Sequence, residues 1–337
     1  MTQQRSLPQV RLLVLALLAL VALLGLAACG DDDKSDGDAT SASTASTATT
    51  SDSGAAITSN PANAKVKITI GSKNFTEQKV LGEVYAQALQ AAGYTVDKQL
   101  NLGDEQTALK TLKQGDISAY PEYTGTALLS FFGVKTDALP HDPAAAFAQV
   151  KTDFAKDDLV ALPPTPFTSS NEVAVTEATA KKYGLTNISD LAKVAKDLTL
   201  YGSPECRQRL DCLLGLQKTY GLKFKKFVPV DLSQRSKVLK DGQADVSIVF
   251  TTDPQNKREK FVLLKDDKGM FPPYNSTLVV RKDVYDKAGP DLEKAIATVN
   301  AKLDADVVQE LNARVDLDKE TPEQAAGEYL KQFGFVK

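Results

Sequence analysis

Two cations, Lys73 and Arg209, follow stretches of the chain that read as strands, and both could bind an anion. Lys73 lies between the strand-like residues 65–70 and a helix pattern that begins near Thr76. Arg209 follows the sequence "GSPE", which comes directly after another strand-like stretch. A helix N-terminus and a guanidinium both favour a carboxylate. We therefore expect the two cations to share an anionic group of a ligand, although a solvated surface charge explains a loop lysine equally well.

Aromatic and hydroxyl side chains stand at the ends of other strand-like stretches. Tyr123 and Thr126 lie in "PEYTGT", Phe250 opens "FTTD", and Tyr274 closes "FPPY". The face of an aromatic ring attracts a cation by roughly 0.5–2 kcal/mol. A small ligand with a carboxylate at one end and a bulky cation at the other would use the cations and the rings together. Ordinary core packing explains these aromatic residues equally well.

Groups that would catalyse a reaction are missing from these strand ends. The sequence contains no nucleophile with a base beside it, no zinc-ligand spacing, no P-loop and no dinucleotide-binding glycine pattern. Its one histidine, His141, lies in "LPHDP", which has the composition of a surface loop. We therefore expect a receptor for a small molecule rather than an enzyme, with no cofactor and no metal ion.

The elements that must position these residues alternate between strand and helix patterns. In the first half, a strand at 66–70, a helix at 76–92, a strand at 94–100, a helix from Asp104 to Gly115 and a strand at 117–120 follow one another. This α/β order predicts a mostly parallel sheet with helices on its faces, and ligands bind beyond the carboxyl ends of such strands. The sequences "LKQGDISAY" and "LKDGQADVSIV" repeat one helix-turn-strand unit, which fits two lobes of like topology or a chance similarity of two such units.

The first 64 residues read as a leader followed by a tether. Arg5 and Arg11 flank the start of an apolar run over residues 12–24, and the sequence "LAAC" ends at Cys29. This arrangement resembles a bacterial lipoprotein signal peptide, residues 1–28, with Cys29 as the lipid-bearing residue; the alternative is an ordinary signal peptide with a chance cysteine. Residues 29–64 are rich in Ser, Thr, Ala and Asp, so we expect a disordered tether with a reach of roughly 30 Å.

The net charge and the cysteines limit the kinds of partner and covalent bond that we expect. The whole chain carries a formal charge of −3, which the arginines of the leader and the aspartates of the tether account for, so residues 65–337 are neutral on balance. The absence of a basic stripe argues against binding to nucleic acid. Cys206 and Cys212 are close in sequence, and in an exported protein we expect them to form a disulfide around Arg209.

Several blocks of the sequence resemble one family from about residue 66 to the C-terminus. They are "IGSKNFTEQKVLGEVYAQALQAAGYTV", "LKQGDISAYPEYTGTAL", "GSPE", "VFTTD" and "LKDDKGMFPPY". These blocks are similar to the glycine betaine/choline/carnitine substrate-binding proteins of osmoprotectant ABC importers. The resemblance implies a two-lobed type II periplasmic-binding-protein fold, with a hinge and a ligand cleft between the lobes. It also implies a small-molecule ligand and a membrane permease as partners, on the extracytoplasmic face of the cell membrane.

The resemblance implies a role for seven residues. Lys73, Thr126 and Arg209 match the residues that hold the ligand carboxylate in the family. Tyr123 and Tyr274 match two tyrosines of the cage around the quaternary ammonium, and a third cage position falls on Phe250. The fourth falls on Asn171, which is not aromatic. Losing one ring of four gives up roughly 1–2 kcal/mol, about tenfold in affinity. The ligand is therefore a weakly bound betaine, a different zwitterion or a larger molecule with a polar head.

We expect the chain to pass between the lobes near residues 168–171 and 274–277. Lobe 1 would then comprise 65–168 plus 276–337, and lobe 2 would comprise 169–275, in a protein that acts as a monomer. Two other classes of function remain as alternatives. A surface-anchored enzyme would need a nucleophile or metal that the strand ends do not offer, and an adhesion or sensor lipoprotein could keep the same fold.

Overall fold

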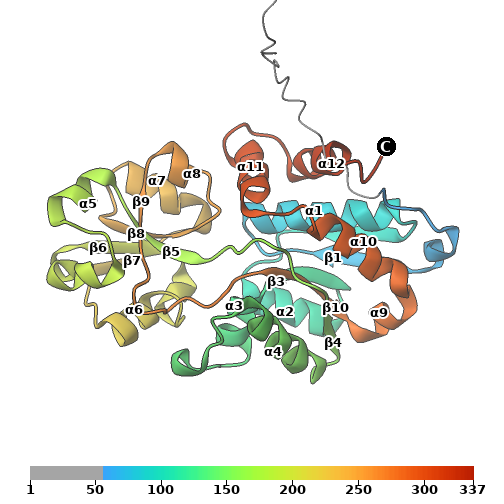
Figure 1. Cartoon of the computed structure of the whole chain (residues 1–337), viewed down its shortest axis with the longest axis horizontal. Coiled ribbons are helices and arrows are strands. Elements are labelled where there is room, and N and C mark those ends of the chain that lie inside the picture. Colours follow the sequence, from blue (N-terminus) through green and yellow to red (C-terminus); the bar gives the residue numbers. More distant parts are fainter. Residues whose placement is uncertain (1–55) are drawn as a thin grey trace, which may run out of the picture. The chain divides into compact units, whose positions relative to one another are not determined.

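Two β-sheets of five strands each organise residues 56–337, the part of the chain that the computed structural model describes (Figure 1). The expected signal peptide, Cys29 and most of the expected tether lie outside the described residues. The last part of that tether packs against the fold. A short 3₁₀ helix covers Pro61–Lys65, and the buried Asn63 donates its amide to the carbonyl of Ala92 at 2.9 Å. Composition alone therefore assigns residues 61–64 to the tether, although they pack against the fold.

The first sheet has the order β2-β1-β3-β10-β4. Strands β1 (Lys67–Gly71), β2 (Thr95–Gln99) and β3 (Ala119–Tyr123) run parallel, as the sequence predicts. Strand β10 (Ser276–Arg281) lies antiparallel between β3 and β4 (Leu159–Ala161). The sheet is therefore mixed rather than mostly parallel, because β10 enters it after the chain has returned from the second sheet.

The second sheet repeats this arrangement in the order β7-β6-β8-β5-β9. Strand β6 (Thr199–Gly202) pairs in parallel with β7 (Lys226–Pro229) and β8 (Val246–Phe250). Strand β5 (Asn171–Val175) runs antiparallel to both β8 and β9 (Val262–Leu264). The like topology expected of two lobes is thus present. The two segments that connect the sheets meet at an antiparallel bridge between Thr168 and Asn275.

Helices cover both faces of the first sheet (Figure 1). The buried side chains of α1 (Thr76–Ala91) join a core with α10 (Pro290–Asn300), α11 (Ala305–Asp316) and α12 (Pro322–Gln332). On the opposite face, α2 (Glu105–Gln114) and α4 (Pro143–Ala155) share a second core. Asp104 caps α2 through the Thr107 N–H at 2.8 Å, and Gly115 ends it with a φ of 87°, as the sequence predicts. Helix α3 (Thr124–Thr126) continues directly from β3, and α9 (Lys282–Ala288) continues from β10.

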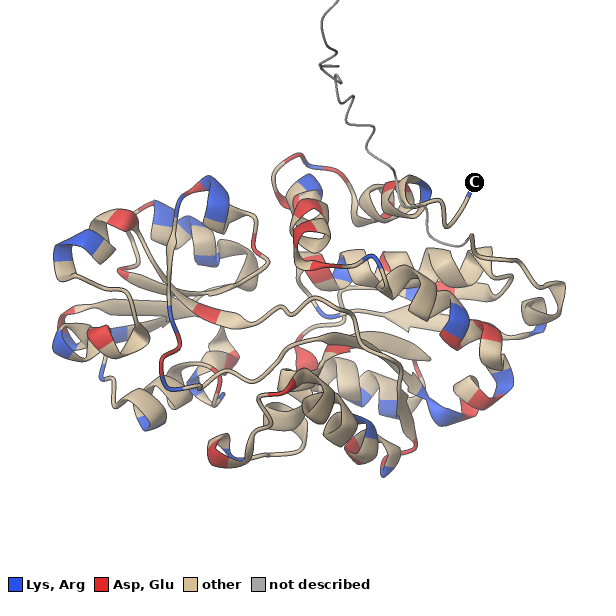
Figure 2. Ribbon diagram, viewed as in Figure 1, with Lys and Arg blue, Asp and Glu red and all other residues tan. Residues whose placement is uncertain are grey.

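Shorter helices cover the second sheet. Helix α6 (Leu213–Tyr220) contributes buried side chains to the larger of its two cores, and α5 (Glu177–Tyr183) packs against that core. Helix α7 (Arg235–Lys240) belongs to the smaller core. Helix α8 (Gln255–Arg258) follows β8. Acidic and basic residues are interspersed along the outer helices of both halves (Figure 2). Within residues 56–337, none of the helices combines the length and apolarity that a membrane span requires.

One partly buried carboxylate in the second sheet predicts a pH dependence of stability. Glu172, in β5, accepts a hydrogen bond from the Val173 N–H at 3.2 Å and has no cationic partner among the described residues. Burial raises the pKa of Glu172 to about 7. The folded chain therefore binds this proton more tightly than the unfolded chain, so the free energy of unfolding decreases as the pH rises from about 5 to above 7.

We expect Glu172→Gln to remove this part of the pH dependence. At pH 8 the variant should exceed the parent in its free energy of unfolding by on the order of 2 kcal/mol, with a much smaller difference at pH 5. Urea unfolding at both pH values measures the change. Glu310→Gln, at an exposed position of α11, is the matched control. Equal effects of Glu172→Gln at the two pH values would contradict the prediction.

Candidate functional site

One cavity is lined by all seven residues that the sequence predicts to bind a ligand. Its empty volume is about 620 Å³, which includes open solvent at its mouth. The seven residues are Lys73, Tyr123, Thr126, Asn171, Arg209, Phe250 and Tyr274. They come from strands of both sheets, from the loops and the short helix α3 that follow strands, and from a segment that connects the sheets. The structure thus brings the predicted residues together, and their role in binding stays a prediction.

The strand ends explain why these residues meet. Lys73, Tyr123 and Phe250 stand at or just beyond the carboxyl ends of β1, β3 and β8, where ligands bind in open α/β sheets. Asn171 and Tyr274 arrive differently, at the beginnings of antiparallel strands. Asn171 pairs with Phe250 in the ladder of β5 and β8, and Ser276, two residues after Tyr274, pairs with Tyr123. An antiparallel strand begins beside the carboxyl end of the strand with which it pairs. The first residues of β5 and the residues just before β10 therefore lie beside the carboxyl ends of β8 and β3.

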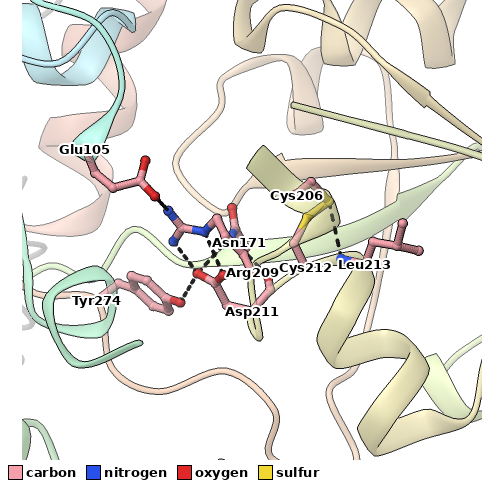
Figure 3. The surroundings of a disulfide bond; sticks show 8 residues. All are labelled: Glu105, Asn171, Cys206, Arg209, Asp211, Cys212, Leu213 and Tyr274. Carbon is pink, nitrogen blue, oxygen red and sulfur yellow. Dashed lines mark hydrogen bonds and ion pairs between the residues drawn. A yellow bond between two sulfur atoms is a disulfide. The ribbon is translucent and has the colours of Figure 1, made fainter. Parts of the chain in front are cut away.

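Arg209 lies at the centre of a network of buried charges (Figure 3). Its Nε and Nη2 donate to the two oxygens of Asp211 at 2.8 and 2.5 Å. Its Nη1 donates to Glu105 Oε1 at 2.7 Å, and Nη2 also lies 3.5 Å from Thr126 Oγ1. These contacts use most of the N–H donors of the guanidinium. Burial alone would lower the pKa of Arg209, but the two carboxylates raise it well above its usual value.

Asp211 holds three of the seven predicted residues in place. Besides Arg209, the Tyr274 hydroxyl donates to Oδ2 of Asp211, and the Asn171 amide donates to the same oxygen at 3.1 Å. The Asp211 side chain is fully buried. Burial alone would raise its pKa, yet Arg209 holds the pKa of this carboxyl below its usual range. Asp211 therefore positions the cation, the amide and one ring of the cavity.

A disulfide between Cys206 and Cys212 encloses Arg209 and Asp211 in one short loop (Figure 3). The disulfide expected from the sequence is thus confirmed. The Sγ of Cys206 accepts a hydrogen bond from the Leu213 N–H at 3.3 Å, which connects the loop to the first turn of α6. Cys212 itself lines the cavity. The bond restricts the segment that carries both members of the central ion pair.

Lys73 is also neutralised by a carboxylate. Its Nζ forms an ion pair with Glu122, and the exposed fractions of the two side chains are 5% and 0%. Glu122 accepts further hydrogen bonds from the Tyr120 hydroxyl at 2.9 Å and the Tyr123 N–H at 2.7 Å. The Nζ lies 4.7 Å from the centre of the Tyr123 ring. The two cations predicted to take an anion thus already have buried anionic partners.

Aromatic rings line the rest of the cavity. The ring centroid of Phe75 lies 5.1 Å from that of Phe250 and 6.3 Å from that of Tyr123. The guanidinium of Arg235 stacks on Phe250 at 3.9 Å and forms an ion pair with Asp253 at 3.4 Å. Tyr274 packs closely against Gly125, where an added Cβ would lie 2.6 Å from the tyrosine ring. Only a glycine leaves room for this ring.

Glu77 connects the aromatic wall to both halves of the molecule. It accepts hydrogen bonds from the Tyr123 hydroxyl at 2.6 Å, the Thr252 hydroxyl at 2.5 Å and the Asn312 amide at 3.0 Å. Thr252 follows β8 of the second sheet, whereas Glu77 and Asn312 belong to α1 and α11. The carboxylate therefore fixes the orientation of Tyr123 and joins the two lobes behind the cavity.

Several of these residues are missing from the sequence-based prediction. Asp211 and Phe75 each stand two residues from a predicted cation, in "RLD" and "KNF", and that proximity was a usable signal. Glu122 lies inside the motif "PEYTGT" and was equally accessible. Glu105 gives no such signal, because an acidic residue in the first turn of a capped helix is ordinary. Within residues 56–337, no group of three or more metal-ligating side chains is arranged to hold a metal ion.

The fold and the cavity define a two-lobed solute-binding protein, and comparisons with known proteins identify the family. Residues 66–332 match the family described as the substrate-binding domain of ABC-type glycine betaine transport systems. The chain belongs to this family, which is a transport family and not a family of enzymes. Binding proteins of ABC importers work with a small-molecule ligand and a permease and are extracytoplasmic.

Individual relatives and solved structures resemble the chain over most of its length. The chain is 33% identical over 276 residues to the glycine-betaine-binding protein of Pseudomonas aeruginosa, covering 79% of this chain and 87% of that protein. It is 28% identical to the ergothioneine transport permease/ergothioneine binding protein EgtU of Helicobacter pylori, covering 81% of this chain and 49% of that protein. The crystal structure of a glycine betaine/carnitine/choline ABC transporter superposes with a TM-score of 0.64 at 27% identity, covering 80% of this chain and 99% of the other.

The central ion pair predicts a large loss of stability when one partner is removed. Asp211→Ala leaves Arg209 with Glu105 alone and takes an acceptor from Tyr274 and Asn171. Removing one member of a buried pair is strongly destabilising, so we expect the free energy of unfolding to decrease by about 3 kcal/mol. Urea unfolding measures the change, with Asp318→Ala at an exposed position as the control. An Asp211 variant as stable as the control would show that the pair does not support the fold.

Proposed function

We propose that this protein captures a small quaternary ammonium compound, such as glycine betaine or choline, and delivers it to the permease of an ABC importer. The observation that carries the proposal is the set of rings around one cavity, contributed by both lobes. Tyr123, Phe250 and Tyr274 all line it. A quaternary ammonium has no N–H donor, so ring faces bind it better than hydrogen-bond acceptors do.

Phe75 can supply the ring that Asn171 lacks. Its side chain lines the same cavity and stacks close to both Phe250 and Tyr123. Each ring contact contributes roughly 0.5–2 kcal/mol, so four rings together contribute roughly 2–8 kcal/mol, a large part of the roughly 8 kcal/mol that micromolar binding requires. The polar Asn171 then serves the network around Asp211 rather than the ligand, because its amide donates to that carboxylate.

The receptor would be attached to the membrane at its N-terminal end and would close its two lobes around the ligand. Lipidation of Cys29 and a tether beyond it would keep the protein at the outer face of the cell membrane. We retain 65–168 plus 276–337 as lobe 1 and 169–275 as lobe 2, which would close around the ligand by rotation near the Thr168–Asn275 bridge. The receptor would act as a monomer, without cofactor and without enzymatic activity.

A second candidate is a receptor with changed specificity for a larger zwitterion that carries a polar ring. The polar side chain of Asn171 at one of the four cage positions favours it. The two candidates differ in the ligand and share the fold, the cavity and the permease partner.

Calorimetric titration of the purified protein, freed of bound ligand by unfolding and refolding, tests the proposal. We expect glycine betaine, choline or carnitine to bind with a dissociation constant in the micromolar range. Phe250→Ala should weaken this binding about tenfold or more, because one ring face is lost. Phe224→Ala, a partly buried phenylalanine of the same lobe outside the cavity, should leave it unchanged. Failure of the parent protein to bind any quaternary ammonium compound would refute the proposal and favour the second candidate.

The disulfide provides a further test. Because Arg209 and Asp211 lie inside its loop, we expect the double variant Cys206→Ser/Cys212→Ser to bind the ligand about tenfold more weakly. Closing a loop of this size stabilises the fold by about 2 kcal/mol, so circular dichroism must first show that the variant is folded at the temperature of the titration. Unchanged affinity in a folded variant would mean that the disulfide stabilises the fold without positioning the site.

A further inference from the structure

The contact between Glu105 and Arg209 has a consequence for the charge of the ligand. We infer that Glu105 occupies the place that a ligand carboxylate would need, so that the site prefers a quaternary ammonium cation without a carboxylate, such as choline, over the zwitterion glycine betaine. This inference rests on the proposed function and narrows its ligand class. It makes Glu105, which belongs to none of the matched motifs, a residue that determines specificity.

The geometry at Arg209 supports this role. Both residues line the cavity, Glu105 is 6% exposed, and its Oε1 lies 2.7 Å from Nη1 of Arg209. The other two nitrogens of the guanidinium are engaged by Asp211 and Thr126. A ligand carboxylate could reach Arg209 only by displacing a carboxylate that the protein itself provides. Such an exchange gains little, since one charge-assisted hydrogen bond replaces another.

The other cations of the cavity offer no alternative. Lys73 is paired with Glu122, and Arg235 is paired with Asp253 and stacked on Phe250. Every cation that lines the cavity among the described residues thus has a carboxylate partner of its own. An incoming carboxylate would have to leave water without gaining an unpaired cation, which is unfavourable.

Three carboxylates and three cations line the cavity, and the ion-pair partners Glu122, Asp211 and Asp253 add further negative charge next to that lining. Asp104 and Glu205 line it in addition to Glu105, and neither forms an ion pair within the described part of the chain. The acidic partners of the three cations lie directly behind the wall. The surplus of negative charge attracts a ligand with a net positive charge and repels a second carboxylate, and both effects act strongly in a partly desolvated cavity.

The contact between Glu105 and Arg209 also has a second explanation, and the test must distinguish it from a role in specificity. Glu105 begins α2 in lobe 1 and Arg209 lies in the loop of lobe 2, so the ion pair could serve only to hold the lobes together. An ion pair that only holds the lobes together would affect the binding of every ligand to the same extent. Its loss would change the affinities for choline and for glycine betaine by the same factor.

Titration with a matched pair of ligands separates the two explanations. Choline and glycine betaine share the trimethylammonium group and the methylene next to it, and they differ in whether a hydroxymethyl or a carboxylate follows that methylene. The parent protein, Glu105→Gln and the exposed control Glu310→Gln are titrated with both under one buffer. Glutamine keeps the size of the side chain and removes the charge.

We expect the parent and the control to bind choline at least about tenfold more tightly than glycine betaine. In Glu105→Gln we expect the affinity for glycine betaine to increase about tenfold and that for choline to decrease, a change in the ratio of at least about tenfold. Preference of the parent for glycine betaine, or an unchanged ratio in the variant, would overturn the inference while leaving the proposed function standing. Binding of neither ligand by the parent would overturn both.

Discussion

The largely buried ion pair between Arg209 and Asp211 is the interaction on which the candidate site depends. Burying two charges is unfavourable unless further hydrogen bonds satisfy them. Asp211 obtains these bonds from Tyr274 and Asn171, and Arg209 obtains them from Glu105 and Thr126. The need to satisfy one ion pair therefore orients side chains from both lobes and from the segment that connects them. The disulfide adds a covalent constraint to the loop that carries the pair.

Carboxylates also hold the residues at the other walls of the cavity. Glu122 neutralises Lys73 beside the Tyr123 ring, and Glu77 fixes the hydroxyl of that tyrosine while bonding to Thr252 of the other lobe. The rings thus face the cavity, and carboxylates hold them from behind. A site built in this way presents ring faces together with a field that is negative at short range. That combination suits an ammonium group whose charge is spread over methyl groups, which need contact area and a negative field rather than hydrogen-bond acceptors.

Much of this could be predicted from the sequence, because it follows from local patterns. Alternating strands and helices imply ligand residues at strand ends, and Lys73, Tyr123 and Phe250 stand there. The charge partners could not be predicted in the same way. Glu105 and Arg209 are 104 positions apart, and only the packing of the two lobes against each other brings them together. The antiparallel β5 and β10 depend likewise on the chain crossing between sheets, and the docking of the tether end depends on Asn63 meeting the distant carbonyl of Ala92.

The most direct test of this account is a crystal structure of the protein with choline bound. The account predicts the ammonium carbons within about 6 Å of the ring centres of Tyr123, Phe250 and Tyr274. It also predicts that Arg209 keeps its contacts with Asp211 and Glu105 in that complex. An ammonium group outside the rings, or a ligand oxygen in place of Glu105 on Arg209, would contradict the claim that the protein's own carboxylates organise the site.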